Sequence, residues 1–285
     1  MNIDVGIIGG SGVYDAGMLD QVHEVEVNTP FGKPSDLITL GSFATINVAF
    51  LPRHGKGHTI SPSNLNAQAN ILALKKLGVK RIISASAVGS LKLEMKPLDI
   101  VIPDQIFDRT HLRKNTFFDK GIVAHTGFAD PFCQNLRTLI TDTGKKAGYN
   151  IHPAGTYICI EGPQFSTRAE SKVYQSLGFD IIGMTALPEA RLARETEICY
   201  AMVATVTDYD VWHEEDVEIG TVIKNIAKNE AAVQDIIKKT LENMNLLKDD
   251  CTCNHALVGA ILTDPAKIPA NQKERLKDIL GDYLK

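Results

Sequence analysis

The stretch Ala201-Met-Val-Ala-Thr-Val-Thr-Asp-Tyr-Asp210 decides the fold of this 285-residue chain. Its first seven residues are mostly small or β-branched and predict a buried strand, which ends in two carboxylates, Asp208 and Asp210. Side chains at positions i and i+2 of a strand share a face, and ligands of open α/β sheets bind at the carboxyl ends of strands. Neighbouring acids repel, which raises the pKa of at least one and suits a general acid near neutral pH. The alternative is a turn in which an Asp side chain caps the backbone.

Strands and helices alternate on both sides of this stretch. Apolar runs predict further strands at residues 4–8, 46–51, 81–84, 99–103, 156–160 and 179–184. Helical signals predict helices at residues 61–77, 131–146, 188–198, 222–244 and 272–284, and Thr167 with Glu170 has the capping-box pattern that opens a further helix. This alternation predicts one α/β catalytic domain over residues 1–250. We expect residues 251–285 to form a helical extension that packs on this domain.

The composition is typical of a globular enzyme, with 44% hydrophobic and 22% charged residues. A formal net charge of -4 argues against a protein that binds nucleic acid or an anionic membrane. No apolar run approaches the length of a membrane span, and no basic region precedes the N-terminal apolar run as in a signal peptide. We therefore expect a cytoplasmic protein.

The chain has five cysteines, and an odd number is not typical of a secreted disulfide framework. Cys251 and Cys253 lack the second pair that a zinc site of the CxxC type shows. We therefore predict no metal site. The pair can form a strained disulfide or remain two thiols, and a reducing cytosol favours the thiols.

Small or polar residues follow several of the predicted strands. Gly10-Ser-Gly12 offers backbone amides and a hydroxyl to an anion, and Arg53 with His54 follows the second strand. Arginine binds phosphate oxygens in a bidentate way, although an Arg-His pair is also typical of a solvated loop. Ser86-Ala87 and Thr185 lie in further loops. Together these groups suit an oxyanion such as phosphate.

The glycine loop leaves a different class open, a dinucleotide-binding oxidoreductase. Its fingerprint needs a third glycine, and Asp15 stands at that position. It also needs an acidic residue closing the second strand, where this chain has Pro52 and Arg53. The sequence therefore favours phosphate over a nicotinamide dinucleotide.

Six stretches resemble one known enzyme family. They are Gly9-Gly-Ser-Gly12, Asn28-Thr-Pro-Phe-Gly-Lys-Pro-Ser-Asp36, Arg53-His-Gly55, Glu161-Gly-Pro-Gln-Phe-Ser-Thr-Arg-Ala-Glu170, Gly183-Met-Thr185 and Thr207-Asp-Tyr-Asp210. Over about residues 3–245 the chain resembles the methylthioadenosine phosphorylases, in the trimeric branch of the purine nucleoside phosphorylase family. The pair Cys251 and Cys253 is similar to that of the archaeal, hexameric type. The resemblance implies a single-domain nucleoside phosphorylase fold with a central mixed sheet flanked by helices.

The family reaction is phosphorolysis of 5'-methylthioadenosine to adenine and 5-methylthioribose 1-phosphate, which serves methionine and purine salvage. The resemblance implies inorganic phosphate as a co-substrate, with no redox or metal cofactor. The implied phosphate site consists of Ser11, Arg53, His54, Ser86, Ala87 and Thr185. The implied nucleoside site places Met184 under the ribose, with Phe165 and Ser166 beside the adenine.

The resemblance places Asp208 and Asp210 against the purine edge, as the catalytic residues. Relatives that cleave 6-oxopurines carry an asparagine at the position of Asp208. An acid suits adenine, because it accepts from the amino group and, when protonated, donates to N7. The acid pair argues against inosine compounds such as methylthioinosine, but adenosine and 5'-deoxyadenosine remain open alternatives.

The resemblance also implies an apolar pocket for the 5' substituent, lined by Ile219, Val222 and Ile223. The alternative for these aliphatic residues is ordinary helix core. His125 resembles a residue that reaches into the site of a neighbouring subunit. The implied partners are the nucleoside, phosphate and further copies of this chain, in a trimer or a hexamer.

Overall fold

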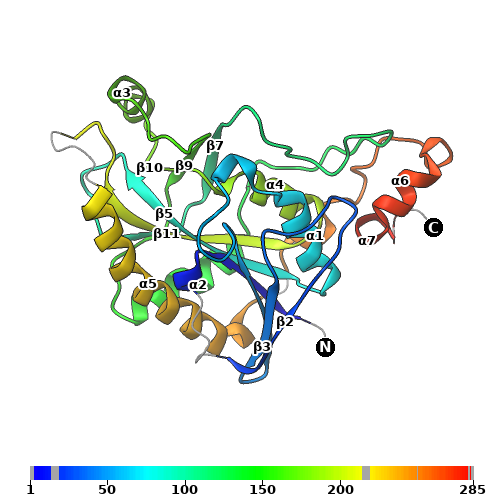
Figure 1. Ribbon diagram of the computed structural model, residues 1–285, viewed down its shortest axis with the longest axis horizontal. Helices are drawn as coiled ribbons and strands as arrows, with labels where there is room; N and C mark the ends of the chain where they lie inside the picture. Colours follow the sequence, from blue (N-terminus) through cyan, green and yellow to red (C-terminus); the bar gives the residue numbers. More distant parts are fainter. Residues whose placement is uncertain (1–2, 14–18, 214–218, 249, 282, 284–285) are drawn as a thin grey trace.

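Figure 1 shows the computed structural model, which describes residues 3–13, 19–213, 219–248, 250–281 and 283. One sheet of eleven strands runs through these residues. The strands are β1 (Val5–Gly9), β2 (Asp20–Val25), β3 (Ile38–Phe43), β4 (Ile46–Pro52), β5 (Arg81–Ser90), β6 (Ile100–Val101), β7 (Gln105–Arg109), β8 (Ile151–His152), β9 (Thr156–Ile160), β10 (Ile181–Gly183) and β11 (Cys199–Tyr209). The helices are α1 (Ala67–Lys76), α2 (Gln134–Lys146), α3 (Arg168–Ser176), α4 (Ala186–Glu195), α5 (Ile219–Glu242), α6 (Ala270–Arg275) and α7 (Lys277–Leu280). The fold is the mixed α/β architecture that the sequence predicted.

The strand β5 is the point where the sheet divides. β4, β1, β5 and β11 are parallel neighbours, so their carboxyl ends meet at one edge. On one side β5 pairs with β1 as far as Ser84, and then with antiparallel β10 at Gly89 and Ser90. Residues 85–88 therefore have only β11 as a partner strand. This gap in the pairing opens the sheet beside the ends of β1 and β4.

Side chains of β11 alternate between two cores, as the period of a strand requires. Tyr200 and Met202 join one core with residues of α1 and α4, and Ala201 and Val203 join another with α2 and α5. Figure 1 shows these two helix pairs on opposite faces of the sheet. Both faces of β11 are covered, which explains why its residues 199–204 are apolar without interruption.

Several predicted elements differ from the structure. The segment at residues 85–90, expected as a loop, continues β5 because β11 supplies hydrogen bonds along its whole length. The final helix is split into α6 and α7 at Leu276, whose backbone is not helical. The exposed, polar strand β2 was not predicted from the sequence, and neither was β3, which it pairs with.

The residues after α5 return to the body of the molecule. Leu257, Ile268, Leu276 and Leu280 belong to the same core as α1. Figure 1 shows α6 and α7, in red, at the end of the molecule beside α1. Of the described helices, none is both long enough and apolar enough to cross a membrane.

Candidate active site

A cavity of about 400 Å³, here called the central cavity, lies where the sheet divides. Its walls come from the carboxyl ends of the parallel strands, from β10 and from one face of α5. Of the predicted site residues it contains Arg53, His54, Ser86, Ala87, Phe165, Ser166, Met184, Thr185, Asp208, Asp210 and Val222. The fold therefore brings residues that are far apart in sequence to one place.

The acids reach the central cavity through a bulge in β11. Val206 lies opposite Val88 and Asp208 lies opposite Gly89, so Thr207 is an extra residue in the ladder. A bulge reverses the alternation of side chains beyond it, so Thr205 and Asp208 line the same cavity although they are three positions apart. The i, i+2 argument holds for Asp208 and Asp210, but the bulge was not predicted.

Two asparagines of α5 compensate for the broken ladder. The Asn229 side chain donates to the carbonyl of Val206, at 3.0 Å, and the Asn225 side chain donates to that of Thr207, at 2.7 Å. Spacing by four residues puts both amides on one face of the helix. These contacts give the backbone carbonyls at the bulge side-chain donors from α5, in addition to the N–H of Leu98 that donates to Val206.

The electrostatics of the two acids favour their protonated forms. Burial, opposed by a hydrogen bond from Thr207 and assisted by the neighbouring Asp210, raises the pKa of Asp208 to about 6. Burial also raises the pKa of Asp210. Among the described residues, three buried side-chain oxygens have no hydrogen-bond partner: Oδ2 of Asp210 and the hydroxyls of Ser166 and Ser171, the last of which acts on the Asp210 carboxyl and lowers its pKa. Asp210 and Ser166 line the central cavity, so their oxygens are available to a ligand there.

Arg53 is not in a solvated loop, because only 2% of it is exposed. Its Nε donates to Oε1 of Glu189 at 2.6 Å, and its Nη2 donates to Oε2 at 3.2 Å. Nη1 donates to the carbonyl of Ala85, and Nη2 also donates to the hydroxyl of Ser84. A guanidinium has five N–H groups, so one Nη1 hydrogen is left without a partner among the described residues. Sequence reasoning missed Glu189, which forms a buried ion pair with this guanidinium.

His54 is buried and neutral. Its Nδ1 lies 2.8 Å from the carbonyl of Ile60, so Nδ1 carries the proton and Nε2 presents a lone pair. Burial lowers the pKa of His54 to about 4. The ring of His58 stacks on it with 4.3 Å between centroids, a contact that no sequence signal predicted.

Two hydroxyls from different strands meet at the opening in the sheet. Ser86 Oγ and Thr185 Oγ1 are 2.8 Å apart. The backbone N–H of Thr185 donates to the Tyr157 hydroxyl, and a Cβ on Gly183 would lie 2.1 Å from that same oxygen. Glycine at 183 is therefore required by the close approach of Tyr157.

The remaining predicted residues lie elsewhere. The side chains of Ser11 and Ile219 are outside the described residues. Ile223 is 61% exposed, because it lies about 100° around α5 from the cavity-lining Val222. His125 is outside the central cavity, and its backbone N–H donates to Ala260.

The glycine loop does not have the form that a dinucleotide fold needs. Ser11–Val13 is a 3-10 turn, whereas that fingerprint opens an α-helix. A Cβ on Gly12 would clash with the carboxylate of Glu230, so this loop packs directly on α5. Glu230 also lines the central cavity, and sequence reasoning missed it.

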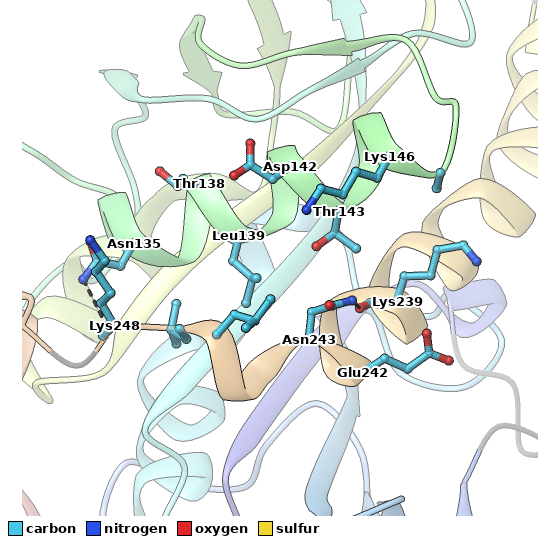
Figure 2. A pocket seen from close by; sticks show the side chains of 13 residues that line it. Asn135, Thr138, Leu139, Asp142, Thr143, Lys146, Lys239, Glu242, Asn243 and Lys248 are labelled. Atoms are coloured by element: carbon cyan, nitrogen blue, oxygen red, sulfur yellow. Dashed lines mark hydrogen bonds between the residues drawn. The ribbon is translucent and has the colours of Figure 1, made fainter.

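A larger hollow of about 580 Å³ lies between α2 and the end of α5. Figure 2 shows its side chains, among them Lys146 and Glu242, on the two helices. None of the predicted site residues lines this hollow, which lies away from the opening in the sheet. We therefore assign the active site to the central cavity.

The prediction of no metal site rested on a missing second pair of cysteines, and that premise is wrong. The structure brings Cys133 and Cys199 to Cys251 and Cys253, with all four sulfur atoms within 4.8 Å of one another. Cys133 and Cys199 lie too far from Cys251 in the sequence to form a local metal-binding motif with it. Only the tertiary fold joins the two pairs.

Known proteins resemble this chain over most of its length. A model of the phosphorylase superfamily matches residues 4–242. The S-methyl-5'-thioadenosine phosphorylase of Koribacter versatilis is 51% identical over 287 residues, which cover 100% of this chain and 98% of that protein. A crystal structure of a methylthioadenosine phosphorylase from an antarctic soil metagenomic library has a TM-score of 0.94 and 45% identity, and the match covers 98% of this chain and 99% of that one.

A mutant of the adenosine/methylthioadenosine phosphorylase of Schistosoma mansoni, in complex with methylthioadenosine, has a TM-score of 0.85 and 36% identity. The match covers 90% of this chain and 98% of that one. These likenesses confirm the resemblance seen in the six sequence motifs. The chain belongs to the phosphorylase superfamily and, within it, to the family of S-methyl-5'-thioadenosine phosphorylases.

Proposed function

We propose that this chain catalyses the phosphorolysis of 5'-methylthioadenosine, with inorganic phosphate as co-substrate and no cofactor in the reaction. The observation that carries the proposal is a buried acid, Asp208, in the same cavity as a cluster of phosphate-type donors. The family relatives named for this activity support it. A location in the cytoplasm remains a prediction.

The phosphate end of the cavity is formed by Arg53, His54, Ser86 and Thr185, with Ala87 beside them. The spare Nη1 hydrogen of Arg53 and the two hydroxyls donate to phosphate oxygens. The lone pair on His54 Nε2 instead accepts a hydrogen bond from a protonated oxygen, which selects a phosphate that still carries a proton. Ser11, whose side chain lies outside the described residues, is proposed to complete this set.

The chemical step joins the two ends of the cavity. The bond from C1' of the ribose to N9 of the base breaks, and its electron pair goes to the purine. A phosphate oxygen forms the new bond to C1', while Asp208 gives its proton to N7. The phosphate negative charge stabilises the positive charge that develops on the ribose. Asp210 orients the base and supports the high pKa of its neighbour.

The base is recognised by matching donors to acceptors. A protonated Asp208 donates to N7, and the unpartnered Asp210 Oδ2 accepts from the exocyclic amino group of adenine. A 6-oxopurine offers an acceptor in place of that amino group, which leaves the carboxylate oxygen without a donor. We therefore propose that 6-aminopurine nucleosides are preferred.

Adenosine is a second candidate substrate. The apolar cavity residues Val222, Ile226 and Val233 of α5 suit a methylthio group, but Glu230 of the same helix offers an acceptor for a 5'-hydroxyl. The Schistosoma relative is named for both nucleosides.

We also propose a homo-oligomer built on a threefold axis, either a trimer or a hexamer. Ile223 is exposed on α5, the helix that lines one side of the central cavity. Phe165, which also lines this cavity, is 53% exposed. A neighbouring subunit that supplies His125 would cover these apolar side chains. Light scattering is expected to give a multiple of three chains, and an active monomer would contradict this arrangement.

The function is tested by measuring release of the free base from methylthioadenosine, adenosine and inosine, each with and without phosphate. We expect adenine release that depends on phosphate, fastest with methylthioadenosine and slowest with inosine. The control is the same assay after exhaustive removal of phosphate. Equal release without phosphate would identify a hydrolase and reject the proposal.

A further inference from the structure

Four of the five cysteines form a single cluster at the start of β11, in which three are buried and Cys251 is partly exposed. Cys133 precedes the first residue of α2, Cys199 is the first residue of β11, and Cys251 and Cys253 lie in the C-terminal extension. All four sulfur atoms lie within 4.8 Å of one another, and the closest contact, between Cys199 and Cys251, is 3.3 Å. Cys133, Cys199 and Cys253 are between 3% and 6% exposed.

The spacing of these sulfur atoms fits a shared metal ion better than disulfide bonds. A zinc ion bound at about 2.3 Å by four thiolates in a tetrahedron holds each pair of sulfur atoms about 3.8 Å apart. Disulfide bonding requires a sulfur–sulfur distance of about 2.05 Å within each pair, and all five cysteines are free thiols here. A cluster in which all four atoms are mutually close is the arrangement that one ion produces.

The surrounding backbone holds the cluster together independently of the thiols. The N–H of Cys133 donates to the carbonyl of Tyr200 at 2.8 Å, which joins α2 to β11. The Asn135 side chain donates to the carbonyl of Lys248 and to the carboxylate of Asp250. Figure 2 shows the chain after α5 running beside α2 to the contact between Lys248 and Asn135. All three segments that carry cysteines are thus held in place by other contacts.

We propose that Cys133, Cys199, Cys251 and Cys253 bind one zinc ion as a tetrathiolate site. Thiolate ligands and a closed coordination sphere are typical of structural zinc, and softer thiolate sites select zinc over magnesium or calcium. Binding releases the thiol protons to solvent, and the divalent charge compensates the thiolates in their buried surroundings.

The zinc ion has a structural role rather than a place in the reaction. Asp208 lies nine residues beyond Cys199 along β11, which corresponds to about 30 Å at about 3.3 Å per residue. The ion connects the C-terminal extension to α2 and β11. Its loss is therefore expected to lower thermal stability, while the intrinsic kinetics of the remaining folded protein stay unchanged.

The test is the metal content of the full chain, purified with a reducing agent and without chelator. Elemental analysis is expected to give about one zinc per chain, and less than a tenth of that in Cys253→Ser and Cys251→Ser. The matched control is Cys159→Ser, because Cys159 is the buried cysteine outside the cluster and should keep the full zinc content. Replacement of zinc by cobalt should produce the thiolate charge-transfer bands and intense visible bands of a tetrahedral site.

The cobalt spectrum of the unaltered protein keeps the proposal testable even if the serine variants do not fold. Absence of zinc, together with failure of the reduced protein to bind zinc or cobalt, would overturn the proposal. Disulfides among these four cysteines in protein isolated and denatured without exposure to oxidants would overturn it as well. Zinc that remains in both Cys251→Ser and Cys253→Ser would place the ion elsewhere and reject this site.

Discussion

The two ends of β11 differ in how their functional groups come together. At the carboxyl end, Asp208 and Asp210 are close in sequence, and a bulge directs their side chains toward a cavity that small molecules can enter. At the amino end, Cys199 meets thiols from two other segments in a closed cluster. One end keeps buried polar atoms without partners, whereas the other end brings its polar atoms into mutual contact. Unsatisfied groups are typical of a reaction site, and closed sets are typical of a structural one.

The largest expected effect of a substitution is at the carboxyl end. Asp208→Asn keeps the shape of the side chain but cannot transfer a proton to N7, so turnover with methylthioadenosine should fall about 10²–10⁴-fold. Asp210→Asn should reduce turnover less, because its proposed work is orientation. Steady-state kinetics of both variants, with thermal melts to verify folding, measure the difference. Unchanged turnover in Asp208→Asn would show that Asp208 has a structural role at the end of the strand and does not act as the general acid.

The second effect concerns the ion pair of Arg53 and Glu189, which lies near the carboxyl end of β11. Arg53→Met should lower the free energy of unfolding by about 3–5 kcal/mol, because Glu189 is left as an uncompensated buried charge. Adding Glu189→Gln should recover much of the stability. It should not recover phosphate affinity, since the guanidinium donor is still missing. Chemical denaturation measures the role of Arg53 in stability, and the KM for phosphate measures its role in binding. If the double variant recovers both stability and phosphate affinity, Arg53 does not bind phosphate.

A smaller effect is expected at the opening in the sheet. Thr185→Val removes one donor to phosphate, which should raise the KM for phosphate about 10–100-fold and leave the KM for the nucleoside nearly unchanged. Thr138→Val, on the exposed face of α2, is the control and should change neither constant. An equal increase in both constants after Thr185→Val would show that the threonine does not act on phosphate alone.

Features that depend on residues close together in the chain could be predicted from the sequence. β9 was predicted with the bounds that it has, and the capping box at Thr167 and Glu170 opens α3 as expected. These features depend on residues close together in the chain, for which local patterns are informative. Most of the predicted site residues also lie in one cavity, because parallel strands place their carboxyl ends at one edge.

What the sequence could not predict depends on contacts between distant segments. Glu189 reaches Arg53 across 136 positions, and the thiol cluster joins segments that lie at least 52 positions apart. The bulge at Thr207 follows from the pairing with β5, which no property of β11 alone reveals. Ile223 is exposed although its neighbour Val222 lines the cavity, since the face of a helix that is buried depends on its position against the sheet.

The central claim is that protonated Asp208 acts on the leaving base, and its most direct test is the pH dependence of kcat/KM for methylthioadenosine. Burial raises the pKa of Asp208 to about 6, so the active protonated form is lost as the pH rises through that value. At saturating phosphate, kcat/KM should therefore decline about tenfold per pH unit above about pH 6. The residual activity of Asp208→Asn should lack this decline, whereas the ionisation of phosphate affects both proteins equally. Identical pH profiles for the two proteins would contradict the account.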